Sequence, residues 1–253
     1  MSITIKTPAE IDIMRRAGQI QTEILNAVGQ KVAPGISTAN LNEIAEKLCV
    51  EKKVKPAFKS YNGFPAALCT SINDEVVHGI PSDKRILKEG DIITLDFGVI
   101  LEGLYADSCQ TFAVGKISPE AQQLLNRTKE SLYRAIVVAR AGNTVGDIGH
   151  AVESFVTPFG YSPVHETVGH GIGRTLHEDP EVPNWGKPGT GTKLMAGMTI
   201  CIEPIINAGK AEITTDTDGW TTRTADGSLS AHFEHQVLIT KEEPEILTPW
   251  DKI

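Results

Sequence analysis

The fold is decided by two stretches that are matching parts of a repeat, Leu87-Lys-Glu-Gly-Asp-Ile-Ile-Thr-Leu-Asp96 and Leu194-Met-Ala-Gly-Met-Thr-Ile-Cys-Ile-Glu203. Their leucines, their glycines and their final acids are each separated by 107 residues. Gly35-Ile-Ser37 and Gly142-Asn-Thr144, farther upstream, keep the same offset. Solenoid repeats are much shorter, so the shared offset predicts two halves, roughly 1–115 and 116–253, of a single domain spanning 1–253.

Each half begins with sequence typical of two helices. Thr7-Pro8-Ala9-Glu10 is a capping box with proline at the first helical position, and Ser37 is placed to cap a second helix. In the second half, we expect one helix from Ser118 to Gly142 and another from Thr144 to about Gly160. Strand-like sequence follows each pair. The order predicts an α+β fold, with helices on one side of a curved antiparallel sheet and an internal pseudo-two-fold relation.

Charge, apolar runs and cysteine spacing limit the classes of function that this chain can have. The formal charge is −8, which disfavours specific nucleic-acid recognition because binding to phosphates needs clustered Lys and Arg. No apolar run approaches the roughly 18 residues of a membrane helix, and the first residues lack an apolar signal-peptide core. The four cysteines form no CxxC pair, which favours free thiols in a reducing compartment. We therefore expect a cytoplasmic protein without a membrane segment.

Acidic residues occur within apolar strand sequence. Period-two alternation puts Asp96 on the strand face opposite Leu95, and Glu203 has the matching place in the second half. A reversal near residues 101–103 pairs positions whose numbers sum to about 203, which sets Asp107 opposite Asp96. Glu234 projects from a strand over residues 231–239. Each acid alone reads as solvent-exposed. Four converging carboxylates, however, repel one another and indicate a multivalent cation.

Histidines supply a second group of candidates. His170 lies among glycines in Gly169-His170-Gly-Ile-Gly173, where the backbone can approach closely and leave the imidazole accessible. His78 and His177 are equally compatible with structural hydrogen bonding and with a role as ligand or catalyst. The stretch His165-Glu-Thr-Val-Gly-His170 fails as a zincin motif, because three residues rather than two follow the glutamate. We assign no role to the other four histidines, which are His150, His165, His232 and His235.

Taken together, these residues resemble one known family, the type I methionine aminopeptidases of the pita-bread fold, in their short bacterial form. The resemblance covers nearly the whole chain, in order. The matching blocks are Tyr61-Asn-Gly-Phe-Pro, Cys69-Thr-Ser-Ile-Asn, Val77-His78-Gly-Ile-Pro81, Asp96 with Tyr105-Ala-Asp107-Ser, Gly169-His170-Gly-Ile-Gly173, Gly197-Met-Thr-Ile-Cys-Ile-Glu203-Pro and Phe233-Glu234-His235.

The resemblance implies a single catalytic domain with two divalent metal ions, which would be Mn, Fe(II), Co or Zn. Asp96 would chelate one ion, His170 and Glu203 would hold the other, and Asp107 and Glu234 would bridge them. A hydroxide that bridges the metals would be the nucleophile, with Glu203 as general base. His78 and His177 would steady the substrate amide and the oxyanion.

The same resemblance implies how the substrate binds. The methionine side chain and its amide would contact Tyr61, Phe64, Cys69, His78, His177 and Trp220. Two positions depart from the family pattern, Leu176 where phenylalanine is usual and Phe58 at a variable place, and both bear on tolerance for the residue after methionine. The implied partners are nascent polypeptides and peptides with N-terminal methionine, and the ribosome. We expect a monomer.

Two alternatives remain at this stage. Proline-specific aminopeptidases and prolidases share the five-ligand pattern, although they carry a sizeable extra N-terminal domain, and only 95 residues precede Asp96 here. A non-catalytic binding protein on the same fold is the other alternative. Such proteins typically lose metal ligands, whereas this chain keeps all five.

Overall fold

The computed structural model describes residues 3–250, and its four α-helices in that range begin where the capping residues predict. They are α1 (Pro8–Gly29), α2 (Thr38–Lys52), α3 (Pro119–Val138) and α4 (Val145–Val156). Thr7 and Glu10 form the predicted capping box of α1, and Thr144 and Asp147 form that of α4. Short 3₁₀ turns lie at η1 (Tyr61–Gly63) and η2 (Thr157–Phe159).

One helix is shorter than predicted. We expected the third helix to reach Gly142, but α3 ends at Val138. The backbone N–H of Ala141 donates to Thr240, and that of Gly142 donates to Leu194. Bonds to neighbouring segments therefore replace the last helical turn, which is a tertiary effect that helical periodicity does not record.

The first half contributes a four-stranded antiparallel sheet. The long strand β4 (Ile92–Leu101) pairs with β1 (Lys55–Pro56), β2 (Leu68–Ile72) and β5 (Leu104–Ala113). A five-stranded antiparallel sheet in the second half has the order β15 (Glu245–Ile246), β14 (His235–Leu238), β9 (Thr199–Ile202), β7 (Gly169–Gly171) and β8 (Glu178–Val182). Cys109 of β5 bridges to Glu234, so the two halves meet beside the predicted ligands.

Two small antiparallel sheets complete the strand layer. One joins β13 (Ser230–His232), β10 (Ile205–Asn207) and β6 (Ser162–Pro163). The other joins β11 (Ile213–Thr215), β12 (Thr222–Thr224) and β3 (Glu75–Val77), and therefore pairs a strand of the first half with a hairpin of the second.

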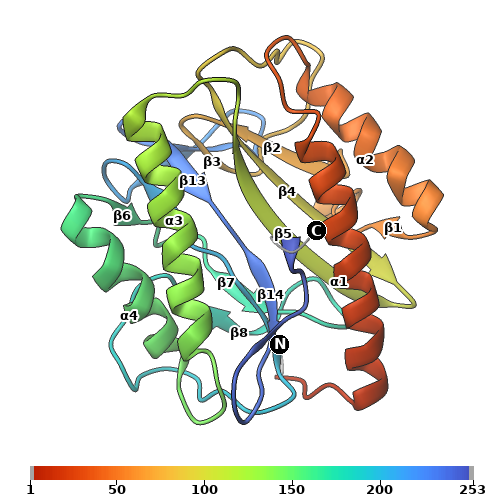
Figure 1. The fold of residues 1–253 in the computed structure, drawn as a ribbon, viewed down its shortest axis with the longest axis vertical. Coiled ribbons are helices and arrows are strands. Elements are labelled where there is room, and N and C mark those ends of the chain that lie inside the picture. Colours follow the sequence, from red (N-terminus) through yellow and green to blue (C-terminus); the bar gives the residue numbers. More distant parts are fainter. Residues whose placement is uncertain (1–2, 251–253) are drawn as a thin grey trace.

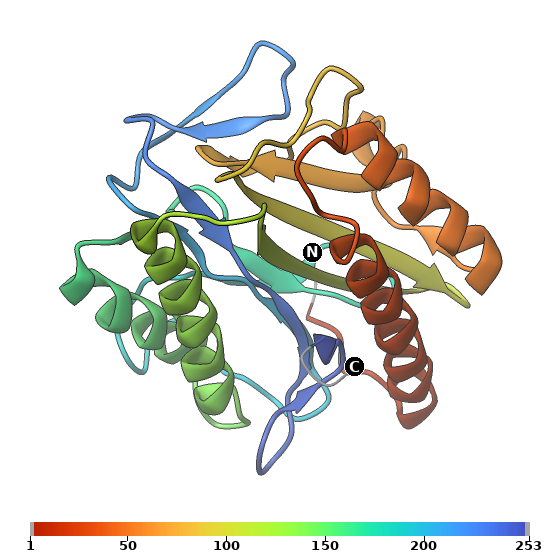
Figure 2. The ribbon, with the colours of Figure 1, turned by 45° about the horizontal axis from the view of Figure 1, so that its top comes forward.

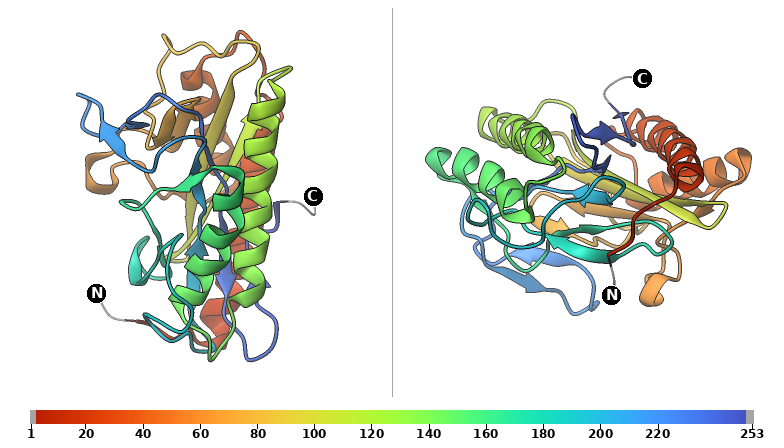
Figure 3. Two further views of the ribbon diagram at one scale, coloured as in Figure 1. Left: turned by 90° about the vertical axis from the view of Figure 1, so that its left-hand side faces the viewer. Right: turned by 90° about the horizontal axis from the view of Figure 1, so that it is seen from below.

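The helices lie on one side of the strands. The pairs α1/α2 and α3/α4 flank the central strands (Figures 1 and 2), and the edge-on views of Figure 3 place all four helices on the same face. A continuous buried core between the layers includes residues of both halves, such as Ala17, Phe97, Val152 and Ile200. The α+β prediction is confirmed. No helix within residues 3–250 is long and apolar enough to cross a membrane.

The β4–β5 hairpin corrects one detail of the sequence prediction. It reverses at Glu102 and Gly103, as expected, but Asp96 pairs with Cys109 and Asp107 with Gly98, a register two residues from the predicted one. Both turn residues have positive φ, typical of a two-residue hairpin turn, so Leu101 pairs directly with Leu104. Asp96 and Asp107 are therefore diagonal neighbours, still within side-chain reach.

Candidate functional site

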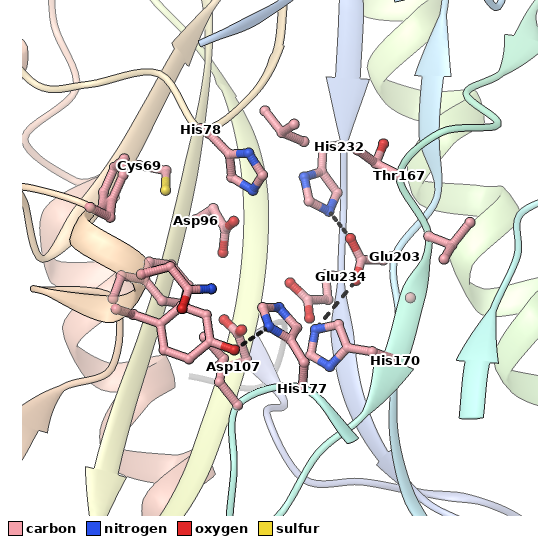
Figure 4. A pocket seen from close by; sticks show the side chains of 18 of the residues that line it. Cys69, His78, Asp96, Asp107, Thr167, His170, His177, Glu203, His232 and Glu234 are labelled. Atoms are coloured by element: carbon pink, nitrogen blue, oxygen red, sulfur yellow. Dashed lines mark hydrogen bonds and ion pairs between the residues drawn. The ribbon is translucent and has the colours of Figure 1, made fainter. Parts of the chain in front are cut away.

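A cavity of about 450 Å³ opens between the two halves and is lined by strand and loop residues of both. Every residue to which the sequence or the resemblance gave a role contributes to its lining. Figure 4 shows that Asp96 and His78 approach from one side and that His170, Glu203 and His232 approach from the other. Residues that are up to 176 positions apart, from Phe58 to Glu234, thus surround one space. The structure brings them together, while their individual roles stay predictions.

Three carboxylates form the centre of the site. The ligand atoms of Asp96, Asp107 and Glu234 all lie within 4.8 Å of one another. Strands β4 and β5 supply the two aspartates, and Glu234 is held by its backbone N–H, which donates to the carbonyl of Cys109 at 3.0 Å. The carbonyl of Glu234 in turn accepts from the indole of Trp250 at 3.0 Å. Backbone contacts thus set the positions of the acids.

These carboxylates are electrostatically costly in the absence of a cation. Burial raises the pKa of Asp96 to about 7, and burial together with the neighbouring acids raises the pKa of Asp107, Glu203 and Glu234 well above its usual value. One buried oxygen of Asp96, one of Asp107 and one of Glu234 have no hydrogen-bond partner. Converging, unpartnered oxygens are the ligands that divalent cations need, so these residues fit a metal site.

His170 has the geometry of a nitrogen ligand. Its Nδ1 lies 2.9 Å from the carbonyl of Gly171, which leaves Nε2 to face the site, 3.6 Å from Oε1 of Glu203. Burial, with His177 nearby, lowers the pKa of His170 to about 3, so the ring is neutral and can offer a lone pair. An orienting bond to the second ring nitrogen is typical of metal-ligating histidines.

The glycines around His170 are required by packing. A Cβ atom on Gly169 would lie 2.3 Å from the carbonyl oxygen of Cys201, and one on Gly171 would lie 2.2 Å from that of Asp179. Because β7 runs between β8 and β9, only glycine lets the three backbones approach this closely. The predicted close backbone approach at this motif is confirmed.

Cys201 lies nearer the site than sequence reasoning recognised. Its sulfur, a ring nitrogen of His170 and a carboxylate oxygen of Glu234 lie within 4.8 Å of one another. Burial and the adjacent acids raise the pKa of the Cys201 thiol well above its usual value, which keeps it protonated. The five ligands that the resemblance implies do not include this cysteine. The sequence does contain a signal for this position, because period-two alternation puts the side chains of Cys201 and Glu203 on the same strand face.

The remaining residues form an apolar recess with imidazoles at its mouth. Phe64 packs edge-on against Trp220 with ring centroids 5.2 Å apart, and Cys69 pairs with Asp96 across β2 and β4. The hydroxyl of Tyr61 lies 2.7 Å from Nδ1 of His177. Leu176 and Phe58, the two departures from the family pattern, are buried against the same recess.

His78 has an unusual backbone conformation. Its φ of 60° lies in the left-handed region, which non-glycine residues adopt at an energetic cost. The ring is exposed to the cavity and lies edge-on to Trp220, with centroids 6.2 Å apart. A strained backbone that presents a side chain to a cavity is typical of functional residues.

His232 is the residue that sequence reasoning missed. It is 2% exposed, lines the cavity, and places Nε2 3.5 Å from Oε2 of Glu203 (Figure 4). The available signal was its separation of two residues from Glu234, which puts both side chains on one strand face. The other unassigned histidines lie elsewhere: His150 is exposed on α4, His165 packs on Trp185, and His235 stacks on Trp250.

Comparison with known proteins gives a consistent result. The model of metallopeptidase family M24 matches residues 12–241. A methionine aminopeptidase from Clostridium acetobutylicum is 49% identical over 97% of this chain and 98% of its own length. The crystal structure of a methionine aminopeptidase from Thermotoga maritima superposes with a TM-score of 0.96 at 42% identity, covering 98% of this chain and 99% of the other. A prolidase from Pyrococcus horikoshii shares the fold, with a TM-score of 0.78 at 24% identity. That match covers 96% of this chain and 63% of the prolidase chain.

Proposed function

The chain belongs to metallopeptidase family M24, among its methionine aminopeptidases, and on that premise we propose which of its residues release the N-terminal methionine of a polypeptide. The resemblance seen in the sequence is confirmed, and with it the pita-bread fold and the hydrolase activity. The observation that carries the assignment of residues is the set of buried, unpartnered carboxylate oxygens that face the cavity.

Five residues would hold two divalent ions. Asp96 would chelate one ion, His170 and Glu203 would hold the other, and Asp107 and Glu234 would bridge them. The proximity of Asp96, Asp107 and Glu234 supports this division, as does the approach of His170 to Glu203. When bound, such ions lower the pKa of a water and polarise a carbonyl. Carboxylates with one imidazole suit Mn, Fe(II), Co or Zn.

Glu203 would act as the general base. It faces the cavity and is mostly buried, so its carboxylate would take a proton from the attacking water and deliver it to the leaving amine. A buried carboxylate with a raised pKa is suited to hold that proton between the two steps.

His78 and His177 would bind the scissile amide. Both rings line the cavity, and burial lowers the pKa of His177, which keeps it neutral. The Tyr61 hydroxyl fixes the orientation of the His177 ring through Nδ1, so Nε2 is free to donate to the developing oxyanion. His78 would donate to the same amide from the opposite side of the site.

The apolar recess would receive the methionine side chain. Phe64 and Trp220 offer aromatic faces and Cys69 offers a buried thiol, a lining that suits a polarisable thioether. Tyr61 and His78 would close the mouth of the recess. The substrate α-amine would then lie beside the carboxylates, which would account for cleavage at a chain end.

We also propose a cellular setting. All four cysteines, each within residues 3–250, are free and buried, which is typical of a reducing compartment, so we place the enzyme in the cytoplasm. Nascent polypeptides with N-terminal methionine would be its substrates, encountered at the ribosome. We propose that the enzyme is a monomer. Gel filtration and cosedimentation with ribosomes test these two points.

Peptide cleavage tests the proposal. Chelated protein is reloaded with Mn or Co and given Met-Ala-Ser, Met-Pro-Ala and, as control, Ala-Pro-Ala, and free amino acids are measured. We expect metal-dependent release from the two methionine peptides alone. Cleavage of Ala-Pro-Ala alone would move the chain to the proline-specific enzymes. Bound metal without cleavage of any peptide would instead support a non-catalytic protein.

A further inference from the structure

His232 is fixed in place by the neighbouring hairpin. Its backbone N–H donates to Oγ1 of Thr111 at 3.0 Å, and its carbonyl accepts from the same hydroxyl at 2.8 Å. Thr111 Oγ1 is in turn 2.8 Å from Oγ1 of Thr94. These contacts join the end of β13 to β4, which carries Asp96, and to β5, which carries Asp107. The position of the imidazole is therefore set by the same strands that set the carboxylates.

The ring nitrogens of His232 lack hydrogen bonds. Both nitrogens of His232 are buried, and neither makes a hydrogen bond in this structure. Buried polar atoms are usually hydrogen-bonded because leaving them unpaired is costly, so an imidazole that faces a cavity without hydrogen bonds calls for a functional explanation. The ring lies between His78 and Glu203 (Figure 4), and its Nε2 is 3.5 Å from Oε2 of Glu203.

Glu203 is approached from both sides. His170 Nε2 lies 3.6 Å from Oε1, and His232 Nε2 lies 3.5 Å from Oε2. His232 thus approaches the one carboxylate oxygen of Glu203 that His170 does not approach. Its place beside the second oxygen of the carboxylate is therefore that of an orienting group.

We propose that His232 is a positioning residue, which donates Nε2–H to Oε2 of Glu203 and fixes the plane of that carboxylate. Oε1 then stays turned toward His170, and the carboxylate cannot rotate away from the substrate amide. This inference rests on the proposed role of Glu203 as general base. It predicts an effect on the rate of the chemical step, with substrate binding and metal content preserved.

Kinetics of two variants test the inference. In His232→Phe the donor is lost at similar ring size, and we expect kcat to fall roughly 10- to 100-fold, the loss typical of one hydrogen bond to a charged group. KM should stay within about twofold, because ground-state binding is unaffected. His232→Gln can still donate through its amide and should recover most of kcat. His150→Gln, on the exposed face of α4, is the matched control and should behave as wild type.

Metal analysis and ¹⁵N NMR complete the test. Both variants should retain two metal equivalents. In ¹⁵N-histidine spectra of the zinc-loaded wild type, we expect the imidazole proton of His232 on Nε2. The His232 resonance is assigned by its absence from the spectrum of His232→Gln. Metal loss in His232→Phe, a rise in KM alone, an equal defect in both variants, or a proton on Nδ1 would each overturn the inference. The NMR result needs no folded Phe variant. Failure of the proposed function would look different, because wild-type protein would then release no methionine.

Discussion

At the residue scale, Glu203 is the side chain on which the assigned chemistry depends most. We predict that Glu203→Gln lowers kcat by roughly 10²- to 10⁴-fold, the usual contribution of a general base, because the amide cannot accept the proton. The amide has nearly the same size, so the free energy of unfolding of the metal-free protein should change little. Steady-state kinetics and urea unfolding, with metal content measured in parallel, check both parts. Near-normal turnover would exclude the assigned role.

His78 allows a complementary prediction. The exposed ring lines the cavity, and its proposed role is to bind the substrate amide rather than a metal. His78→Ala should therefore lower kcat/KM by roughly 10²- to 10³-fold, as for the loss of an oxyanion donor, while both metals stay bound. His150→Ala, at an exposed site, is the control. Metal loss in His78→Ala would make this histidine a structural support instead.

At the element scale, strand β7 permits a test of how backbone packing supports the proposed metal site. Gly171→Ala would bring a Cβ within 2.2 Å of a carbonyl oxygen of β8, so the two strands must separate. We predict a loss of at least about 2 kcal/mol in the free energy of unfolding, within the usual range for overpacking, together with weaker metal binding because His170 is displaced. Urea unfolding and metal titration measure the two effects.

The start of helix α1 provides a comparison with Gly171, because a change there should affect stability without affecting the cavity. Thr7 accepts from the backbone of Glu10, on the outer layer of the molecule, and does not line the cavity. Thr7→Ala should cost about 0.5–2 kcal/mol of stability, the usual cost of losing an N-cap, with kcat and metal affinity unchanged. If Thr7→Ala weakened metal binding as much as Gly171→Ala does, general destabilisation would account for both.

At the scale of the whole molecule, metal binding should stabilise the fold in a pH-dependent way. A divalent ion at 100 times its dissociation constant contributes about 2.7 kcal/mol, or roughly 5–10 °C in Tm for a chain of this size. The carboxylates must be ionised to bind it, and burial raises the pKa of Asp96 to about 7, with Asp107, Glu203 and Glu234 also raised.

The direction of this pH dependence follows from those shifts. Protons compete with the metal for Asp96 up to about pH 7, and the raised pKa of the other three acids extends that competition above their usual range. The metal-induced rise in Tm should therefore grow as pH rises through 7 and shrink as pH falls below it. His170 adds nothing in this window, because its pKa of about 3 leaves it neutral throughout. Calorimetry from pH 5.5 to 8, with and without metal, measures the effect. A metal-induced shift that does not vary with pH would contradict the assigned carboxylate ligands.

Much of the local structure was predictable because it depends on short-range chemistry. Thr7 with Glu10 and Thr144 with Asp147 form the helix caps that their spacing predicts, and period-two alternation placed Asp96 on the strand face that points into the cavity. The family resemblance then supplied roles that spacing alone leaves open. Those roles, unlike the fold and the activity, still await the experiments described above.

The sequence by itself therefore determined the helix starts, the strand faces, the repeat and the family, since each depends on neighbours in the chain or on a matched order of motifs. Only the tertiary structure decided which side chains meet. It ended α3 at Val138, shifted the β4–β5 register by two residues, and brought His232 and Cys201 to the carboxylates. Such contacts depend on strand order, turn geometry and the junction between the halves. These place residues more than 100 positions apart within a few ångströms, and no local pattern encodes that.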